Sequence, residues 1–303
     1  MEQDILNEPL LKERSYVKSI TAGMRLPLRH PWGFLRHLWP LLLLNTLLWA
    51  LVSKWVATHL WAFCQIAFSH GLTAGELAGA PLLSVLGWGL LAFAILGLWA
   101  GQTCFLMRRF AELNYLPAVQ PWKIWHDIMP LAIQGCLVFV LGYIVAAALA
   151  LLCLLVLSSR IWAFSLFCLL IILWAIFYCM VGTRFLMASG TVKARLQGSF
   201  SDLRHMGGWS AIAAVCGILL ITILLVGSAP VICTTYVGGL SDVSVAIGDG
   251  TDVPSSFAYL RAASFALTFL IAPIAWMFLL VPLCFKWGSE AATAVTNVQE
   301  EAS

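Results

Sequence analysis

The sequence predicts an all-α fold, a polytopic membrane bundle of six transmembrane helices arranged as three similar hairpins. Hydrophobic residues make up 61% of the 303 residues, and charged residues make up only 10%. A soluble domain carries about 25% charged residues, so this chain has too little charge to cover a water-soluble body of its size. Long uncharged runs and an uneven distribution of basic residues between loops are the other two observations, and they define the individual helices.

The uncharged runs give the spans, because a helix needs about 20 mostly apolar residues to cross the hydrocarbon core. The first run ends at Lys54, whose side chain can extend outward so that the helix continues to residue 57. Arg160 divides a run that is too long for one crossing, and it therefore predicts a tight hairpin. The predicted spans are residues 37–57, 80–104, 130–157, 161–183, 209–230 and 262–285.

Lysine and arginine residues are concentrated in alternate loops. With these six spans, 14 of the 17 lie on one side of the membrane and 3 on the other. Basic residues in short loops stay on the cytoplasmic side, so both termini are predicted to be cytoplasmic. The predicted organisation is a cytoplasmic segment with an amphipathic interfacial part (1–36), a transmembrane domain (37–287) and a disordered cytoplasmic tail (288–303).

Two predicted helix starts share a motif at a constant offset of 90 residues. The shared residues are Pro31, Trp32, Pro40 and Leu41 in the first copy and Pro121, Trp122, Pro130 and Leu131 in the second. A degenerate third copy occupies residues 199–209. We interpret each copy as a short amphipathic segment on the inner membrane face that turns into the bilayer, since Pro favours a first helical turn and Trp favours the headgroup level. The alternative, that any protein with basic cytoplasmic loops acquires such residues there, stays open.

Basic and aromatic residues at the predicted cytoplasmic helix ends are candidates for contact with anionic lipid headgroups. The candidates are Trp32, Arg36, His37, Trp122, His126, Arg184, Arg204 and His205. Some of them combine acid and base with a neighbour, as in His126-Asp127 and in Asp202 with His205. No known catalytic or metal-binding motif accompanies these pairs, so we predict no catalytic residue, metal or cofactor.

The middle of each predicted span lacks Asp, Glu, Lys and Arg, which argues against an ion-coupled transporter of ordinary design. Asn45 and Gln134 lie at nearly equal depth in the first and third spans. We expect them to make polar contacts inside the bundle, with a bond between them as one arrangement. Cys64 and Cys233, near predicted outer ends, could pair in an oxidising compartment, but two free buried thiols are the favoured interpretation.

The end of the fourth predicted span reads Arg184-Phe185-Leu186-Met187-Ala188, and the segment that leads into the fifth contains Gly198-Ser199-Phe200, Arg204 and Gly208-Trp209. This pattern resembles the membrane domain that accompanies some bacterial glycerophosphodiester phosphodiesterases, and its stand-alone relatives. Ser189-Gly190 stands where that pattern has a proline. The phosphodiesterase domain itself is absent, so the resemblance transfers no catalytic residue. It implies a multi-pass protein of the bacterial inner membrane.

These observations favour a non-enzymatic role in envelope organisation, lipid handling or support of a membrane complex. The alternative is a channel or carrier for a neutral or amphipathic substrate that uses the axis between the hairpins. Anionic lipid headgroups on the cytoplasmic face are the expected partners. A membrane-protein partner or a second copy of the chain is a further candidate, and nucleic acid is not expected.

Overall fold

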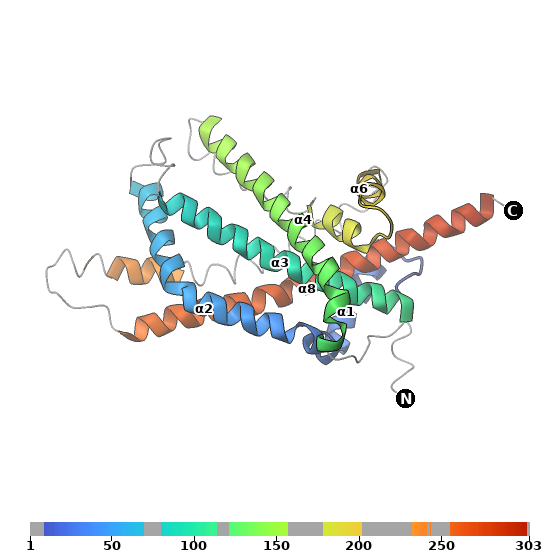
Figure 1. Ribbon diagram of the computed structural model, residues 1–303, viewed down its shortest axis with the longest axis horizontal. Coiled ribbons are helices and arrows are strands. Elements are labelled where there is room, and N and C mark those ends of the chain that lie inside the picture. The colour runs from blue at the N-terminus through green and yellow to red at the C-terminus, as the bar shows by residue number, and fades with distance from the viewer. Residues whose placement is uncertain are drawn as a thin grey trace.

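The computed structural model describes residues 9–69, 80–113, 121–156, 178–201, 232–240, 243 and 255–301. None of these residues forms a strand, which confirms the all-α prediction for the described part of the chain. The main helices are α1 (Tyr16–Arg29), α2 (Pro31–Ser69), α3 (Ala80–Leu113), α4 (Pro121–Val156), α6 (Val192–Ser201) and α8 (Ser255–Glu301) (Figure 1). Residues 178–187 and 232–240 are also helical.

Four helices are long and apolar enough to cross a membrane. Their candidate spans are Pro31–His59, Leu86–Leu113, His126–Leu149 and Ser256–Ala292. They correspond to the first, second, third and sixth predicted spans. The predicted span 161–183 is described only from residue 178, and the predicted span 209–230 lies outside the described residues. The described part is therefore a helical bundle compatible with several membrane crossings.

The helices extend beyond the predicted spans. α2 begins at Pro31 rather than at residue 37, and α8 continues to Glu301. A helix thus occupies most of the segment 288–303, for which the sequence predicts a disordered tail. The predicted bounds stop at the first charged residue, whereas helical hydrogen bonding continues through Arg, Lys and Glu, which are good helix formers.

The first two copies of the Pro-Trp motif begin their helices at equivalent positions. Pro31 is the first residue of α2 and Pro121 is the first residue of α4. The expected turn between an interfacial segment and the span is wrong for both copies, because each motif continues into its span as one helix. Pro is compatible with this continuation at the first helical position, where its missing N–H would have no partner. The third copy, 199–209, is described only as far as residue 201.

The separate amphipathic helix is α1, which ends at Arg29 and packs along α8. Its buried polar and apolar residues recur every three or four positions: Ser19, Ala22 and Leu26. A Cβ added at Gly23 would lie 2.7 Å from the backbone N of Pro282, so the two helices are in close contact. The main-chain N–H of Arg14 donates to Ser289 Oγ at 2.7 Å. These contacts tie the N-terminal segment to the last helix.

α3 lies at the centre and packs closely on α4. A Cβ added at Gly97 would lie 2.5 Å from the carbonyl oxygen of Gly135, and one at Gly101 would lie 2.6 Å from the Cα of Ala132. Such backbone approach is what small residues permit between membrane helices. The small-residue face of the second predicted span is therefore used within the chain.

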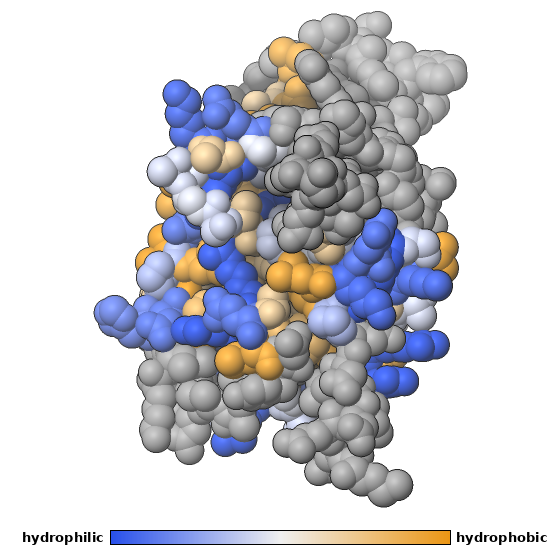
Figure 2. Space-filling model, turned by 90° about the vertical axis from the view of Figure 1, so that its right-hand side faces the viewer, coloured by the Kyte–Doolittle hydropathy of each residue, from blue (hydrophilic) through white to orange (hydrophobic). Residues whose placement is uncertain are grey.

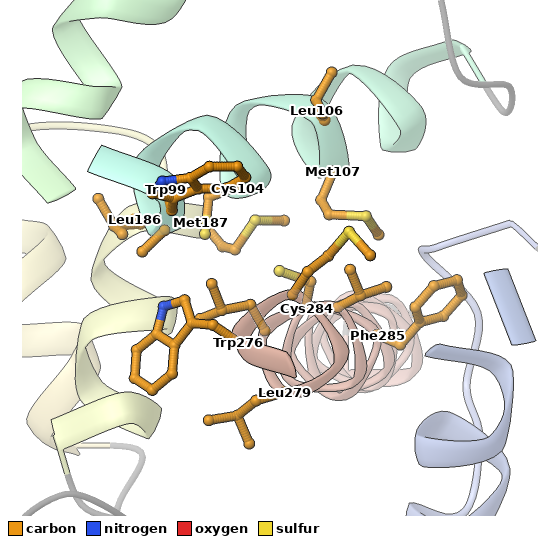
Figure 3. Close-up of a cluster of buried hydrophobic side chains, with 14 of the residues drawn as sticks. Trp99, Cys104, Leu106, Met107, Leu186, Met187, Trp276, Leu279, Cys284 and Phe285 are labelled. Atoms are coloured by element: carbon orange, nitrogen blue, oxygen red, sulfur yellow. The ribbon is translucent and has the colours of Figure 1, made fainter. Parts of the chain in front are cut away.

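A buried hydrophobic cluster joins α3, residues 178–187 and α8 (Figure 3). Figure 3 labels Trp99, Cys104, Leu106, Met107, Leu186, Met187, Trp276, Leu279, Cys284 and Phe285. Cys104 and Cys284 are free and fully buried, and they act there as small apolar residues. Cys233 is also a free thiol, so the structure does not join it to Cys64.

Candidate anion-binding site at the basic end of the bundle

The helix ends that are predicted to be cytoplasmic lie together at one end of the bundle (Figure 1). Near the end of α3, Gln102 Nε2 donates to the main-chain carbonyl of His37, in the N-terminal part of α2, at 2.8 Å. Further along α3, Arg108 donates to the main-chain carbonyls of Leu186 and Ala188. Figure 2 looks onto this end and shows hydrophilic residues interspersed with hydrophobic ones on its described surface.

A pocket of about 300 Å³ opens at this end between α3, α4 and α6. We call it the arginine pocket. Its lining comprises Phe105, Arg108, Arg109, Glu112, Asp127, Pro130, Leu131, Gln134 and Arg195. Three guanidinium groups and two carboxylates thus face the same space, and Phe105, Pro130 and Leu131 give it an apolar wall. This combination suits a ligand with an anionic group and a small apolar part.

Arg195 is the most enclosed cation of the pocket, with only 7% of the residue exposed. Its Nε donates to the carbonyl of Phe185 at 2.9 Å, and its Nη1 donates to Gln134 Oε1 at 2.9 Å. The guanidinium carbon lies 4.2 Å from the centre of the Phe185 ring. Burial lowers the pKa of Arg195 from its ordinary value, and the nearby charge of Arg108 lowers it further. The side chain nevertheless stays positively charged, since arginine is protonated at neutral pH. Its bonds to Phe185 and Gln134 hold it in place.

The two carboxylates of the pocket are engaged by Arg109. Its Nη1 lies 3.0 Å from Glu112 Oε2, and its Nη2 lies 4.0 Å from Asp127 Oδ2. Among the described residues, neither Arg108 nor Arg195 forms an ion pair with a carboxylate; both bond to neutral oxygens. The pocket therefore contains two neighbouring cations that have no carboxylate partner in the described part of the chain.

The exposed side of α1 and the exposed residues at the start of α2 form a second basic feature, which we call the N-terminal basic face. Its residues are Val17, Lys18, Arg25, Leu28, Arg29, Trp32 and Arg36, all of them exposed. Apolar and basic side chains alternate here, and Trp32 is 81% exposed. This pattern is typical of an amphipathic helix at a membrane surface.

The predicted headgroup contacts have different surroundings. Trp32, Arg36 and His126 are exposed and accessible to headgroups, so their role stays a prediction. The side chain of Trp122, and all of Arg204 and His205, lie outside the described residues.

Two of the predicted headgroup contacts are inside the protein. His37 is only 1% exposed because it lies on the side of α2 that faces α3, and its Nδ1 lies 2.7 Å from the carbonyl oxygen of Gly33. The Arg184 side chain is 13% exposed, and its Nη2 lies 3.0 Å from Glu290 Oε2 on α8. For these two residues the headgroup prediction is wrong, because neighbouring helices cover them.

Asn45 and Gln134 both make polar contacts between elements, but not with each other. Asn45 Nδ2 donates to the carbonyl of Phe269 on α8 at 2.7 Å. Gln134 accepts from Arg195, as described above. Their equal depth in the sequence pattern does not bring them together, since they lie on helices with different neighbours.

Sequence reasoning did not identify Arg108, Arg109 and Arg195 as a group. It counted them only as loop charges that set the orientation. Their convergence depends on the return of α6 toward α3 and α4, and no spacing in the sequence encodes that contact. A weak signal exists in Arg108-Arg109, since two adjacent arginines at the end of a span are more than orientation requires.

Among the described residues, no group of three or more His, Cys, Asp or Glu side chains could hold a metal ion. Comparison with protein-family models, with characterised proteins and with solved structures finds no match to this chain. The candidate site is therefore argued from its own geometry.

Proposed function

We propose that the chain is a non-enzymatic, multi-pass protein of the bacterial inner membrane with a role in lipid handling. Its basic end would face the anionic cytoplasmic leaflet, and both termini would be cytoplasmic. The observation that carries this proposal is the N-terminal basic face, which presents four basic side chains beside exposed Val17, Leu28 and Trp32.

Electrostatics and burial both favour a leaflet as the partner of this face. A basic residue near an anionic membrane surface contributes about 1 kcal/mol of attraction. Exposed Trp and aliphatic side chains add favourable burial at the headgroup level, where indole rings are enriched. Because α1 is bound to α8 through Gly23 and Arg14, attraction to the leaflet acts on the whole bundle rather than on a loose segment.

The carrier alternative has less support. It requires a polar path through the bundle, for which Asn45 and Gln134 are the central candidates. The described residues put Asn45 against α8 and Gln134 against Arg195, in separate contacts.

Thermal unfolding in nanodiscs tests the leaflet contact. We expect the wild type to unfold at a higher temperature in discs that contain phosphatidylglycerol than in pure phosphatidylcholine discs. The triple variant Lys18→Gln/Arg25→Gln/Arg29→Gln should lose most of that difference. For a matched single change, Arg25→Gln should reduce the difference and Thr21→Ala, at an exposed uncharged position of the same helix, should not. Equal unfolding temperatures of the wild type in the two kinds of disc would contradict the proposal.

Reporter fusions test the orientation. Fusions after residues 70, 115, 160, 195, 245 and 295 should alternate between outside and inside, beginning outside and ending inside. A fusion after residue 115 or 195 that reports an outside location would refute the proposed orientation of the basic end.

A further inference from the structure

We propose that the arginine pocket binds the headgroup of one anionic phosphodiester lipid, of the phosphatidylglycerol type, with its phosphate between Arg108 and Arg195. The inference rests on the proposed function, because the lipid would come from the leaflet that faces the basic end. It adds a defined site and a ligand class to a general attraction for anionic surfaces.

The first argument is electrostatic. Arg108 and Arg195 line the same pocket, the charge of Arg108 acts on Arg195, and neither arginine forms an ion pair among the described residues. The carboxylate of Glu112 offsets part of the charge of Arg108. Arg195 is also largely shielded from solvent, with only 7% of the residue exposed. Like charges in a poorly solvated place destabilise each other, and an anion between them removes this cost. Arginine is also the side chain best suited to bind phosphate oxygens through two parallel hydrogen bonds.

The second argument concerns the hydrogen-bond donors that remain. A guanidinium has five N–H groups. Arg195 uses one N–H on each of its three nitrogens for Phe185 and Gln134, so one N–H on each Nη is left. Nη1 of Arg108 donates to none of the described residues, because the bonds to Leu186 and Ala188 both come from Nη2. These donors are available to phosphate oxygens in the pocket.

The third argument is charge balance. Three arginines and two carboxylates give the pocket a formal charge of 3 − 2 = +1. A phosphodiester with one negative charge makes the occupied pocket neutral. A dianionic phosphomonoester would leave it at −1, and a zwitterionic headgroup would leave it at +1. A site at a membrane boundary favours the neutral combination, since uncompensated charge is costly there.

The remaining lining fits the rest of such a lipid. Phe105, Pro130 and Leu131 supply apolar surface for the glycerol backbone and the first acyl carbons. Asp127 and Glu112, with half or more of each side chain exposed, can accept hydrogen bonds from the hydroxyl groups of a glycerol headgroup. The volume of about 300 Å³ is at the lower end for small-molecule sites and matches a headgroup rather than a whole lipid.

Native mass spectrometry of the purified full chain in detergent tests the pocket. The probes are dioctanoyl phosphatidylglycerol, dioctanoyl phosphatidylethanolamine, dioctanoyl phosphatidic acid and free glycerol phosphate. We expect a saturable one-to-one adduct with phosphatidylglycerol. Binding of the other two lipids should be weaker by about tenfold, which corresponds to about 1.4 kcal/mol, because each leaves one charge unbalanced in the pocket. Weak binding of glycerol phosphate would show that the apolar part of the lipid contributes.

Two variants give different expectations. Arg195→Gln should weaken phosphatidylglycerol binding by about tenfold or more, since it removes charge-assisted hydrogen bonds to the phosphate. Asp127→Asn raises the formal charge of the pocket to +2 without removing a buried contact. The neutral combination is then the one with dianionic phosphatidic acid, so the affinity for phosphatidic acid should rise by about tenfold relative to the affinity for phosphatidylglycerol. Lys54→Gln removes one positive charge at a distance and should leave the affinity unchanged. Arg195 also donates hydrogen bonds to the carbonyl of Phe185. If Arg195→Gln therefore fails to fold, the lipid binding of Asp127→Asn is the measurement that tests the pocket.

The two proposals fail in different ways. If the wild type binds no saturable phosphatidylglycerol, or if Asp127→Asn leaves the relative affinities for phosphatidylglycerol and phosphatidic acid unchanged, the pocket proposal is wrong. The nanodisc experiment on the N-terminal basic face is then still decisive for the proposed function. If the pocket binds phosphatidylglycerol but the discs show no effect of anionic lipid, the leaflet contact of α1 is wrong and the pocket proposal stands as a lipid site.

Discussion

α2 and α4 begin with the same Pro-Trp pair at an offset of 90 residues, yet equivalent positions in the two helices have opposite surroundings. His37, in α2, is 1% exposed. Asp127, its equivalent in α4, has a side chain that is 55% exposed and faces the arginine pocket. The shared motif thus determines where the helix starts, whereas the neighbouring helices determine whether its side chains are buried.

α3 holds α2 and α4 by different means. It binds the N-terminal part of α2 through a side chain, Gln102, which donates to the His37 carbonyl. It binds α4 through backbone approach at Gly97 and Gly101. α8 and α1 also pack on α2, so one side of its N-terminal part, which includes Phe34 and His37, is covered, while α4 keeps an open side next to the pocket. A structural contact and a ligand-accessible surface can therefore arise from the same motif.

The largest expected effect comes from the backbone contact. Gly101→Val places a branched side chain where even a Cβ would lie 2.6 Å from Ala132 Cα, so α3 and α4 must separate. We expect a loss of about 3 kcal/mol in the free energy of unfolding, measured by thermal or denaturant unfolding in detergent. The matched control is Gly87→Val on the same helix, because a Cβ at Gly87 meets nothing within 4 Å. Similar losses for the two variants would show that helix propensity, rather than close contact, is responsible.

The buried histidine of α2 should give an intermediate effect. His37→Ala removes a buried side chain and should lower the free energy of unfolding by about 2 kcal/mol. His59→Ala is the control, because the His59 ring makes the same local bond, to the Trp55 carbonyl at 2.7 Å, in a more exposed place. A loss for His59→Ala as large as that for His37→Ala would contradict the role of burial.

The bond across the helices can be tested separately from His37 itself. Gln102→Leu removes the donor to the His37 carbonyl and should cost about 1 kcal/mol, the usual net contribution of one hydrogen bond, because that carbonyl keeps its acceptor role within α2. The measurement is again unfolding in detergent. An unchanged stability would mean that packing alone holds the N-terminal part of α2 against α3.

We expect the smallest effect on folding from a substitution in the N-terminal part of α4. Asp127→Ala should change the free energy of unfolding by less than about 0.5 kcal/mol, because the side chain is 55% exposed and its contact with Arg109 is 4.0 Å long. The same variant, like Asp127→Asn, should bind phosphatidic acid in preference to phosphatidylglycerol, because the pocket then carries a formal charge of +2. A large loss of stability would make Asp127 a structural residue and remove the contrast with His37.

The sequence predicts the positions of spans and helix starts well, because these depend on the chemistry of short segments. The uncharged runs locate four described spans, and Pro31 and Pro121 mark two helix starts, because apolar length and proline geometry are properties of short segments. The contacts of His37, Arg184 and Arg195 were not predictable in this way. Each depends on which helix packs beside it, and residues far apart in the chain supply that partner.

The contact between α1 and α8 also has a consequence for the order of assembly. Arg14 and Ser289 are 275 positions apart, so the surface that receives the segment around Arg14 is synthesised 275 residues after it. Until then the face of α1 that contains Ala22 and Leu26 has no α8 to pack against. Pairings between such distant segments form late, since closing a long loop costs entropy before any contact repays it. A nascent chain stopped before residue 282 would present that face to chaperones or to the membrane surface.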